Sequence, residues 1–561
     1  MKTPTTFAYP PIIAGLTLAL ALAVGAAAAG SAIDAATLAA PVRFLSSDSL
    51  EGRGPGSRGD RLARLYLATG LEELGLVPGI PARAAGVSGE GDSWEQRLPM
   101  IGIASQAPAA WVFSSPGGEV SLARWDEFVA VSGVQAPAAA IQDAEVVFVG
   151  YGIQAPEHGW DDFKGVDLKG KVLLMLNNDP DWDEALFAGK RRLYYGRWTY
   201  KYESAARQGA VGAIIIHTTP SAGYPFQVVQ SSWTGEQFEL PAGDEPRLQV
   251  SGWTTESAAE RLVALGGRKL AALVESARSK SFQPVPLGVR TSLALENETR
   301  AVETANVAGL LPGADPALRH EVVVFTAHHD HLGVATADKA GDAIHNGAVD
   351  NATGCAQLLA LAKAFAALPQ PPRRSLLFLF VAAEEQGLLG SRYYTANPTF
   401  SPGRIAANIN LDSANIYGRT RDVTYVGFGK SSLDAVVTAA AAAQGRVVKG
   451  DQAPEKGSFY RSDQFNFARV GVPAIYLDPG TEFVGEGAAA AKARQSSYDS
   501  TCYHQPCDEL TADWVWDGMI EDTELALAVG LAIANADAMP TWNAGDEFAA
   551  ARQRALAETG R

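Results

Sequence analysis

The stretch that decides the fold runs from residue 322 to residue 330 and reads VVVFTAHHD. Comparable β-rich or wholly apolar runs follow at 375–385 (SLLFLFVAAEE), 405–415 (IAANINLDSAN) and 472–478 (VPAIYLD). Helix-like segments lie between them, notably residues 351–368. Fully apolar strands that alternate with amphipathic helices are typical of a mostly parallel sheet covered on both faces. We therefore predict an α/β fold with a mostly parallel central sheet flanked by helices.

The remaining sequence divides by its local pattern. Between about residues 106 and 285, short β-rich runs are separated by Gly, Pro, Asp and Trp, which indicates an inserted β-rich α/β domain. The N-terminal stretch after the first apolar run reads helix, turn, helix. The predicted organisation is a signal peptide (1–32), the N-terminal part of the main domain (33–105), the inserted domain (106–285), the rest of the main domain (286–540) and a C-terminal polar tail (541–561).

Residues 1–32 have the features of a secretory signal peptide. Lys2 precedes an Ala- and Leu-rich run, and small residues follow it. The alternative is an uncleaved membrane anchor, because the run is nearly long enough to span a bilayer. No other stretch reaches that length, so we predict a mature protein outside the cytoplasm, with membrane association only if the segment stays attached.

Composition excludes two classes of protein. Of the 561 residues, 47% are apolar and 19% are charged, which excludes wholesale disorder. The 62 acidic residues exceed the 46 basic ones and give a net charge of -16. Nucleic-acid binding needs clustered positive charge, so no nucleic-acid partner is expected.

The three cysteines are too few for a disulfide scaffold. Cys355 falls on the apolar stripe of a predicted helix and is expected in the core. Cys502 and Cys507 flank His504 in a short loop, and an exported protein meets oxidising conditions. We expect a local disulfide between them, rather than a zinc site, which would need a second pair of ligands.

Five side chains of the types that bind zinc stand out, and four of them follow an apolar run or open the next helix: His328, Asp350, Glu385, Asp412 and His504. Ligands of open α/β sheets bind beyond the carboxyl ends of the strands. Any one of these residues alone is best read as a cap or a surface residue, and the HHDH run alone as an adventitious metal site. Together they form one ordered pattern, which predicts a metal centre.

Two further carboxylates have expected roles beside the ligands. His328 and Asp330 are two residues apart, so on a strand they point to the same side, where the carboxylate accepts the second N–H of the imidazole. Glu384 and Glu385 are expected to close the strand at 375–385 and to diverge. One then binds metal while the other takes a proton from water. His329, His331 and His345 lie nearby and receive no role.

The blocks that carry this pattern resemble the dizinc exopeptidases of clan MH. They are AHHDHLG (327–333), NGAVDNATG (346–354), AAEEQGLLGS (382–391), NLDSAN (410–415) and YHQPCDE (503–509), in the order of that family. Residues 44–67 are similar to the N-terminal block of bacterial members with an inserted domain. Residues 146–180 resemble a protease-associated domain. The resemblance covers nearly the whole mature chain.

The resemblance implies two zinc ions and a role for each residue. His328 and Asp412 would hold one zinc ion, Glu385 and His504 the other, and Asp350 would bridge them. Asp330 would orient His328, and Glu384 would be the general base. The resemblance also implies a cis peptide bond at Asp350–Asn351. Val349, Gln464 and Cys507 depart from residues common in the family, and Gln464 leaves the substrate preference open.

The implied function is a secreted or periplasmic bacterial aminopeptidase that hydrolyses peptides. A dipeptidase or carboxypeptidase on the same site is the first alternative. A glutaminyl cyclase shares the motif set but binds a single zinc and usually lacks the inserted domain, so it is less favoured. A non-catalytic receptor-like protein is also less favoured, because every ligand and Glu384 are present. The sequence leaves the oligomeric state open.

Overall fold

The computed structural model describes residues 33–82, 92–184, 186–233, 235–335, 337 and 341–560. The predicted signal peptide lies outside these ranges. The chain forms two compact units. Unit 1 consists of the described residues of Met1–Leu98, Thr304–Asp451 and Ser462–Arg561, and unit 2 of those of Pro99–Glu303 and Gln452–Arg461.

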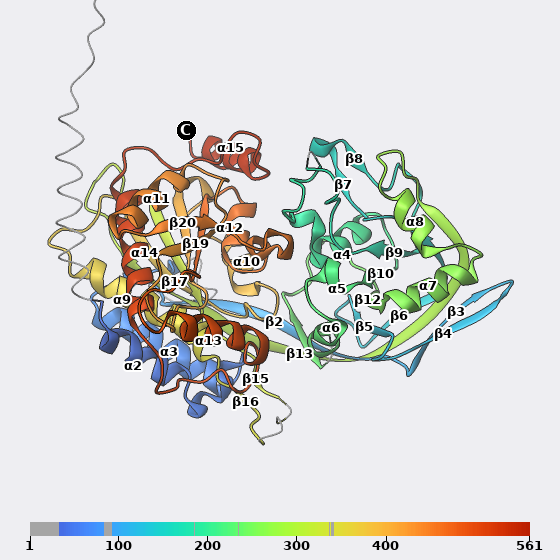
Figure 1. Cartoon of the computed structure of the whole chain (residues 1–561), viewed down its shortest axis with the longest axis horizontal. Coiled ribbons are helices and arrows are strands. Elements are labelled where there is room, and N and C mark those ends of the chain that lie inside the picture. Colours follow the sequence, from blue (N-terminus) through green and yellow to red (C-terminus); the bar gives the residue numbers. More distant parts are fainter. Residues whose placement is uncertain are drawn as a thin grey trace, which may run out of the picture. The chain divides into compact units, whose positions relative to one another are not determined.

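Unit 1 contains the predicted α/β domain, and Figure 1 labels many of its helices and strands. Its helices are α2 (Ala35–Leu45), α3 (Arg58–Glu73), α9 (Thr353–Ala366), α10 (Leu389–Ala396), α11 (Leu433–Ala443), α12 (Gln464–Arg469), α13 (Ala488–Thr501), α14 (Asp517–Asn535) and α15 (Ala549–Glu558). Its strands are β1 (Val77–Pro78), the end of β13 (Val285–Leu311), β14 (Val322–His328), β17 (Ser375–Val381), β18 (Ile405–Asn410), β19 (Asp422–Val426), β20 (Val447–Gly450) and β21 (Ala474–Asp478), with the short pair β15 (Gly333–Val334) and β16 (Ile344–His345).

The sheet of unit 1 is mostly parallel, as predicted. Its strand order is β1, β13, β17, β14, β18, β21, β19, β20. β17, β14, β18 and β21 run parallel, and β13 and β19 are antiparallel to their neighbours in that group. In register, His328 lies opposite Val381, and Thr326 lies opposite Asn410. The carboxyl ends of three strands therefore lie level at one edge.

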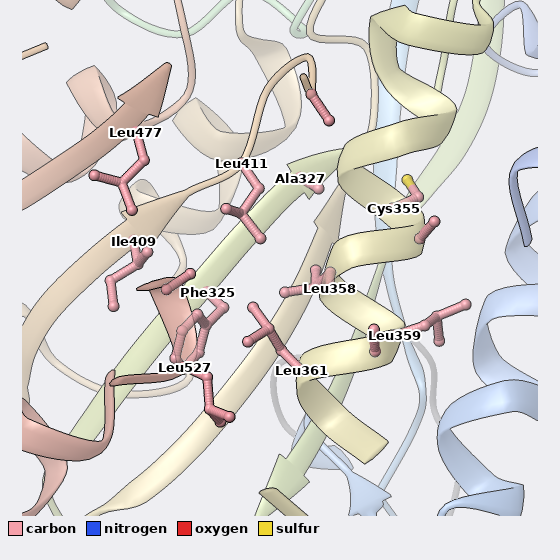
Figure 2. Close-up of a cluster of buried hydrophobic side chains, with 14 of the residues drawn as sticks. Phe325, Ala327, Cys355, Leu358, Leu359, Leu361, Ile409, Leu411, Leu477 and Leu527 are labelled. Atoms are coloured by element: carbon pink, nitrogen blue, oxygen red, sulfur yellow. The ribbon is translucent and has the colours of Figure 1, made fainter. Parts of the chain in front are cut away.

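Both faces of this sheet are covered. In β14 the side chains of Val323 and Phe325 belong to one hydrophobic cluster, and those of Val322 and Val324 belong to another. Such two-sided burial explains why the strand reads as an uninterrupted apolar run. The first cluster includes residues of β14, α9, β18, β21 and α14, shown in Figure 2: Phe325, Ala327, Cys355, Leu358, Leu361, Ile409, Leu477 and Leu527. The expectation that Cys355 is a buried core residue is confirmed.

The strands end sooner than the sequence suggested. β17 stops at Val381, and Ala383 takes a left-handed conformation with φ of 54°. Glu384 and Glu385 consequently lie in a turn after the strand, so the prediction that they close it is wrong. β14 likewise stops at His328, which leaves Asp330 beyond the strand.

Capping side chains and the spacing of apolar residues explain where the N-terminal helices form. Asp34 caps α2 by accepting a hydrogen bond from Thr37 N–H at 2.7 Å, and Ser57 caps α3 through Asp60 N–H at 3.1 Å. The buried residues of α2 recur at helical spacing (Leu38, Val42, Leu45). α2 packs against α9, which in turn contacts β14.

Unit 2 is a β-rich α/β unit. Its main sheet has the order β4, β3, β13, β6, β9, β10, β12, β5, with β6, β9, β10 and β12 parallel. The strands are β3 (Ala110–Ser115), β4 (Gly118–Ala123), β5 (Phe128–Ser132), β6 (Ala138–Phe148), β9 (Val172–Leu176), β10 (Gly212–His217) and β12 (Val250–Thr255), with β2 (Glu95–Gln106) paired to β11 (Glu236–Glu239) and β7 (Gln154–Ala155) to β8 (Trp160–Asp161). The helices are α4 (Trp198–Arg207), α5 (Thr219–Ala222), α6 (Phe226–Ser232), α7 (Glu256–Leu265) and α8 (Leu270–Ser276). Within the described ranges, no helix has the length and apolar character needed to cross a bilayer.

Candidate metal centre

The five predicted ligands come together at the edge where the parallel strands of unit 1 end. His328 is the last residue of β14, and Asp412 follows β18 by two residues. Glu385 lies in the turn after β17, Asp350 in the turn η5 (Ala348–Ala352) before α9, and His504 in the loop after α13. This placement matches the rule that open α/β sheets bind ligands beyond the carboxyl ends of their strands.

Asp350 lies at the middle of the cluster. Its Oδ1 is 3.1 Å from Nε2 of His328, and its Oδ2 is 3.1 Å from Nε2 of His504. The two oxygens of one buried carboxylate thus face two different imidazoles. The peptide bond between Asp350 and Asn351 is cis, which confirms that expectation.

Each imidazole also faces a second carboxylate. Nε2 of His328 lies 3.3 Å from Oδ1 of Asp412, and Nε2 of His504 lies 3.3 Å from Oε2 of Glu385. The cluster therefore divides into two groups that share Asp350. The first contains His328 and Asp412, and the second contains Glu385 and His504.

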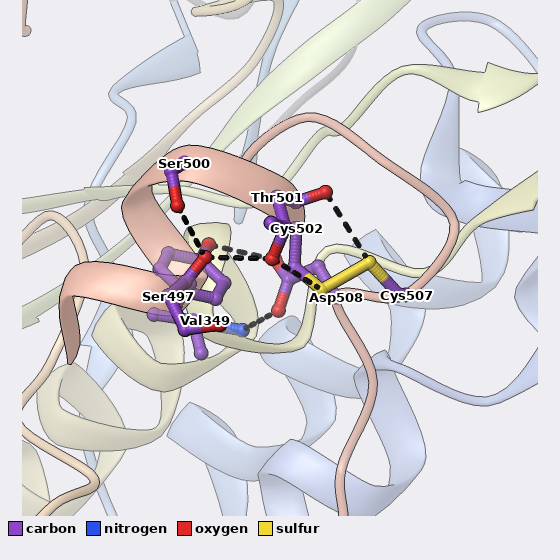
Figure 3. Close-up of a disulfide and its surroundings, with 8 residues drawn as sticks. Val349, Ser497, Ser500, Thr501, Cys502, Cys507 and Asp508 are labelled. Atoms are coloured by element: carbon purple, nitrogen blue, oxygen red, sulfur yellow. Dashed lines mark hydrogen bonds between the residues drawn. A yellow bond between two sulfur atoms is a disulfide. The ribbon is translucent and has the colours of Figure 1, made fainter. Parts of the chain in front are cut away.

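The loop that carries His504 is closed by the expected disulfide. Cys502 and Cys507 are bonded to each other, as Figure 3 shows. Their thiols are therefore not available as metal ligands. Beyond the disulfide, Asp508 accepts hydrogen bonds from the main-chain N–H of Val349 at 2.8 Å and of Asp350 at 3.1 Å.

Asp330 supports the site differently from the expected arrangement. Nδ1 of His328 lies 3.3 Å from the main-chain oxygen of Asp330, whereas the carboxylate is 3.9 Å away. That carboxylate accepts hydrogen bonds from the main-chain N–H of Glu384 at 3.1 Å and of Glu385 at 3.4 Å. Asp330 thus contacts His328 through its backbone and holds the glutamate turn through its side chain.

His331 is a neighbour of the site that the sequence did not single out. Its Nδ1 lies 2.7 Å from Oε1 of Glu385, and its ring is 5.8 Å from that of His504. The side chain is fully buried. Its place in the HHDH run was visible in the sequence, but its partner lies in another loop.

Burial and neighbouring charges shift the pKa values of several side chains at the site. Burial raises the pKa of Glu384 well above its ordinary value, and the nearby charge of Glu385 raises it further. Burial alone would lower the pKa of His328, but Asp412 and Asp350 reverse this and raise it well above its ordinary value. Burial also raises the pKa of Asp330 to about 7. Several carboxylates gathered in a buried site are costly unless cations neutralise them.

The donor set fits zinc. Zinc prefers imidazole nitrogen and carboxylate oxygen in tetrahedral geometry, where two ligand atoms about 2.0–2.2 Å from the ion lie roughly 3.4 Å apart. The nitrogen–oxygen distances of 3.1 and 3.3 Å around His328 and His504 agree with that spacing. Among the described residues, three groups each bring their potential ligand atoms within 4.8 Å of one another. They are His328, Asp350 and Asp412; His328, Glu384 and Glu385; and His331, Asp350 and Glu385.

Comparison with known proteins agrees with this site. Residues 306–529 match Peptidase family M28. Over 203 residues the chain is 28% identical to leupeptin-inactivating enzyme 1 of Streptomyces exfoliatus, which covers 36% of this chain and 42% of that protein. Over 111 residues it is 35% identical to a probable zinc metalloprotease of Pyrenophora teres f. teres, covering 20% and 23%. The chain thus spans less than half the length of these curated relatives.

The fold has a counterpart among solved structures. An aminopeptidase from Aneurinibacillus sp. strain AM-1 superposes with a TM-score of 0.52 at 19% identity, covering 90% of this chain and 95% of that one. The predicted fold class is confirmed. The match of residues 306–529 to Peptidase family M28 agrees with the family that the sequence blocks predict. The donor groups of this site all lie within the residues that match this family.

Proposed function

We propose that the protein is a secreted or periplasmic dizinc aminopeptidase that removes N-terminal residues from peptides. The observation that carries the proposal is the position of Asp350, whose Oδ1 faces His328 and whose Oδ2 faces His504. A carboxylate so placed suits a bridge between two cations. His328 and Asp412 would complete one site, and Glu385 and His504 the other.

The chemistry follows from the residues beside the ligands. Zinc held by these residues would lower the pKa of a bound water towards about 7 and would polarise the carbonyl of the peptide bond. Glu384 is the general base that takes the proton from the attacking water and returns it to the leaving amine. General acid–base transfer of this kind contributes roughly 10²–10⁴-fold to a rate. Asp330 positions Glu384 by accepting its main-chain N–H.

Two parts of the proposal lie outside the metal centre. Residues 1–32 act as the export signal, so the enzyme meets peptides outside the cytoplasm. Unit 2 corresponds to the inserted protease-associated domain. Its parallel strands β6, β9, β10 and β12 and its β-rich composition support that assignment.

The test is product analysis by mass spectrometry on one peptide panel, with zinc measured on the same protein. The panel contains free-amino, amino-acetylated, C-terminally amidated and N-terminal Gln peptides. We expect loss of N-terminal residues from free-amino peptides only, and two zinc ions per chain. C-terminal loss would instead indicate a carboxypeptidase, and loss of ammonia from N-terminal Gln a cyclase. Absence of turnover with zinc bound would indicate a binding protein.

The role of Glu384 has its own control. Glu384→Gln removes the proton acceptor and keeps the shape of the side chain, so zinc content should stay unchanged while turnover falls by about 10²-fold or more. The matched control is Glu486→Gln, an exposed glutamate of the same unit, which should keep normal turnover. Normal turnover in the Glu384 variant with full zinc content would rule out this role.

A further inference from the structure

Three arginine side chains of unit 2 lie close together, and they have fewer carboxylate partners than charges. Arg192 and Arg197 flank the short turn η4 (Tyr194–Gly196), and Arg461 ends the segment Gln452–Arg461, which belongs to the same unit. We refer to these three side chains as the arginine cluster. Arg192 is buried, Arg197 is half-buried and Arg461 is exposed.

Two contacts join the two segments that carry the cluster. The main-chain N–H of Arg192 donates to the carbonyl of Pro454 at 3.1 Å. The rings of Tyr194 and Tyr460 lie 6.4 Å apart. Arg461 directly follows Tyr460, so its charge lies close to the turn between Arg192 and Arg197.

Arg197 carries a half-buried charge that has no anionic partner among the described residues. Its Nε is buried and has no hydrogen-bond partner, and within the described ranges no carboxylate forms an ion pair with it. The nearest aromatic face is that of Trp198, with the guanidinium carbon 6.0 Å from the ring centre. Burial, together with the charges of Arg461 and Arg192, lowers the pKa of Arg197 to about 10. A buried charge of this kind is costly unless an opposite charge joins it.

Asp179, the carboxylate whose charge acts most on Arg192, already accepts a hydrogen bond. The charge of Asp179 acts on Arg192, but its Oδ2 accepts the main-chain N–H of Leu193 at 2.9 Å. Asp179 also faces Lys201, whose ammonium donates to the carbonyls of Tyr151 and Asn178. Asp179 thus acts on both Lys201 and Arg192, and Asp162 is a second carboxylate that acts on Lys201. Nε of Arg192 remains buried without a partner.

We propose that the arginine cluster binds an oxyanion and that this anion is a carboxylate of a peptide substrate. Guanidinium groups present paired N–H donors that match the two oxygens of a carboxylate, and such charge-assisted bonds are the strong ones. Arg461 and the exposed part of Arg197 leave the cluster open to a solute. The inference rests on the proposed function only for the identity of the anion, since sulfate or phosphate offers the same oxygens.

The test measures binding to the full, zinc-loaded protein by calorimetry and needs no turnover. The ligands are an amino-acetylated tripeptide with a free C-terminal carboxylate, the same peptide as its C-terminal amide, and inorganic sulfate. We expect the carboxylate form to bind about tenfold tighter than the amide, because a hydrogen bond to a charged group is lost in the amide. Sulfate should compete with the carboxylate form.

Variants distinguish the cluster from the metal centre, which also attracts anions. Arg197→Gln and Arg461→Gln should each bring the ratio of the dissociation constants of the two peptides close to one. Arg191→Gln, an exposed neighbour with the same change of charge, should keep it. Arg197→Gln should also leave the melting temperature of the ligand-free protein unchanged or higher, because an unpaired buried charge is removed. A merely structural arginine would lower it.

Each outcome of the binding test either supports or overturns the proposed anion site. Equal binding of the two peptides to the unaltered protein, or a preference that survives in both variants, would overturn the proposal. Sulfate binding that depends on Arg197 without any preference for the carboxylate peptide would make this an inorganic-anion site and would overturn the substrate assignment. Loss of peptidase activity alone would affect only the proposed function, because none of these measurements depends on hydrolysis.

Discussion

The carboxylate of Asp508 accepts a hydrogen bond from the main-chain N–H of Asp350 at 3.1 Å. The same carboxylate accepts one from Val349 at 2.8 Å, and the hydroxyl of Tyr498 donates to it at 3.2 Å. Asp508 lies four residues after His504 in the same loop. One segment therefore supplies a predicted ligand and also fixes the turn that carries the predicted bridging carboxylate.

Removing this acceptor should weaken the metal centre. Asp508→Ala leaves two buried N–H groups without a partner, at a cost of about 1–3 kcal/mol in the free energy of unfolding. Residues that orient ligands typically change metal affinity by about 10–100-fold. We expect a loss of that size in a zinc competition titration. Asp508→Asn should lose less, since its amide oxygen still accepts a hydrogen bond. Asp513→Ala, at an exposed site, is the control, and equal zinc affinity in both alanine variants would contradict the inference.

His331 should hold Glu385 in place. Its Nδ1 lies 2.7 Å from Oε1 of Glu385, and the ring is fully buried. His331→Ala should release the carboxylate and reduce zinc bound after dialysis from two ions per chain towards one, with the site of Glu385 and His504 emptied first. The control is His320→Ala, an exposed histidine of the same unit. Two tightly held zinc ions in the His331 variant would show that Glu385 needs no such support.

The sequence predicted the sheet well because burial on both faces leaves a local trace. Val322 to Ala327 read as one apolar run, since the two clusters on either side of β14 each need alternate residues of it. The candidate ligands could be identified from the sequence because side chains of the types that bind zinc follow such runs. The sequence did not predict where these side chains lie relative to the ends of the strands. Ala383 takes a left-handed conformation that its side chain does not favour, so nothing local marked the end of β17.

Asp508 and His331, which contact the candidate ligands or their turns, were harder to predict for a different reason. Asp508 and Asp350 are 158 positions apart, and His331 meets Glu385 in a separate loop. A carboxylate or an imidazole in a polar loop carries no local signal of a partner that only the folded chain brings near. The cysteine pair was predictable because both residues lie in one short loop.

The disulfide should stabilise the loop of His504. In the chain-entropy description, closing a loop between residues five positions apart lowers the free energy of the folded state relative to the unfolded one by about 2 kcal/mol. The double variant Cys502→Ser, Cys507→Ser should therefore lose about that much stability in urea unfolding, and it should bind zinc more weakly because His504 is less restrained. The unaltered protein treated with a reducing agent should behave in the same way. Unchanged zinc affinity in both preparations would show that other contacts position His504.

Asp60 should make stability depend on pH. Its carboxylate is fully buried, accepts from the hydroxyl of Thr304 at 2.9 Å, and lies 3.4 Å from Nε of Arg64. Burial raises its pKa from 3.8 to about 6, and Arg64 offsets this only in part. The folded state thus favours the protonated form. Its stabilising contribution is complete below about pH 4 and is lost as the pH rises through about 6.

A pair of variants isolates this contribution from other titrating groups. Asp60→Asn cannot ionise, so the free energy of unfolding of the unaltered protein, taken relative to this variant, should fall by about 3 kcal/mol between pH 4 and pH 7. Urea unfolding at several pH values measures the difference, and groups common to both proteins cancel. Asp126→Asn, at an exposed site, should show a flat difference. A flat difference for Asp60→Asn as well would mean that Arg64 and Thr304 compensate the buried charge in full.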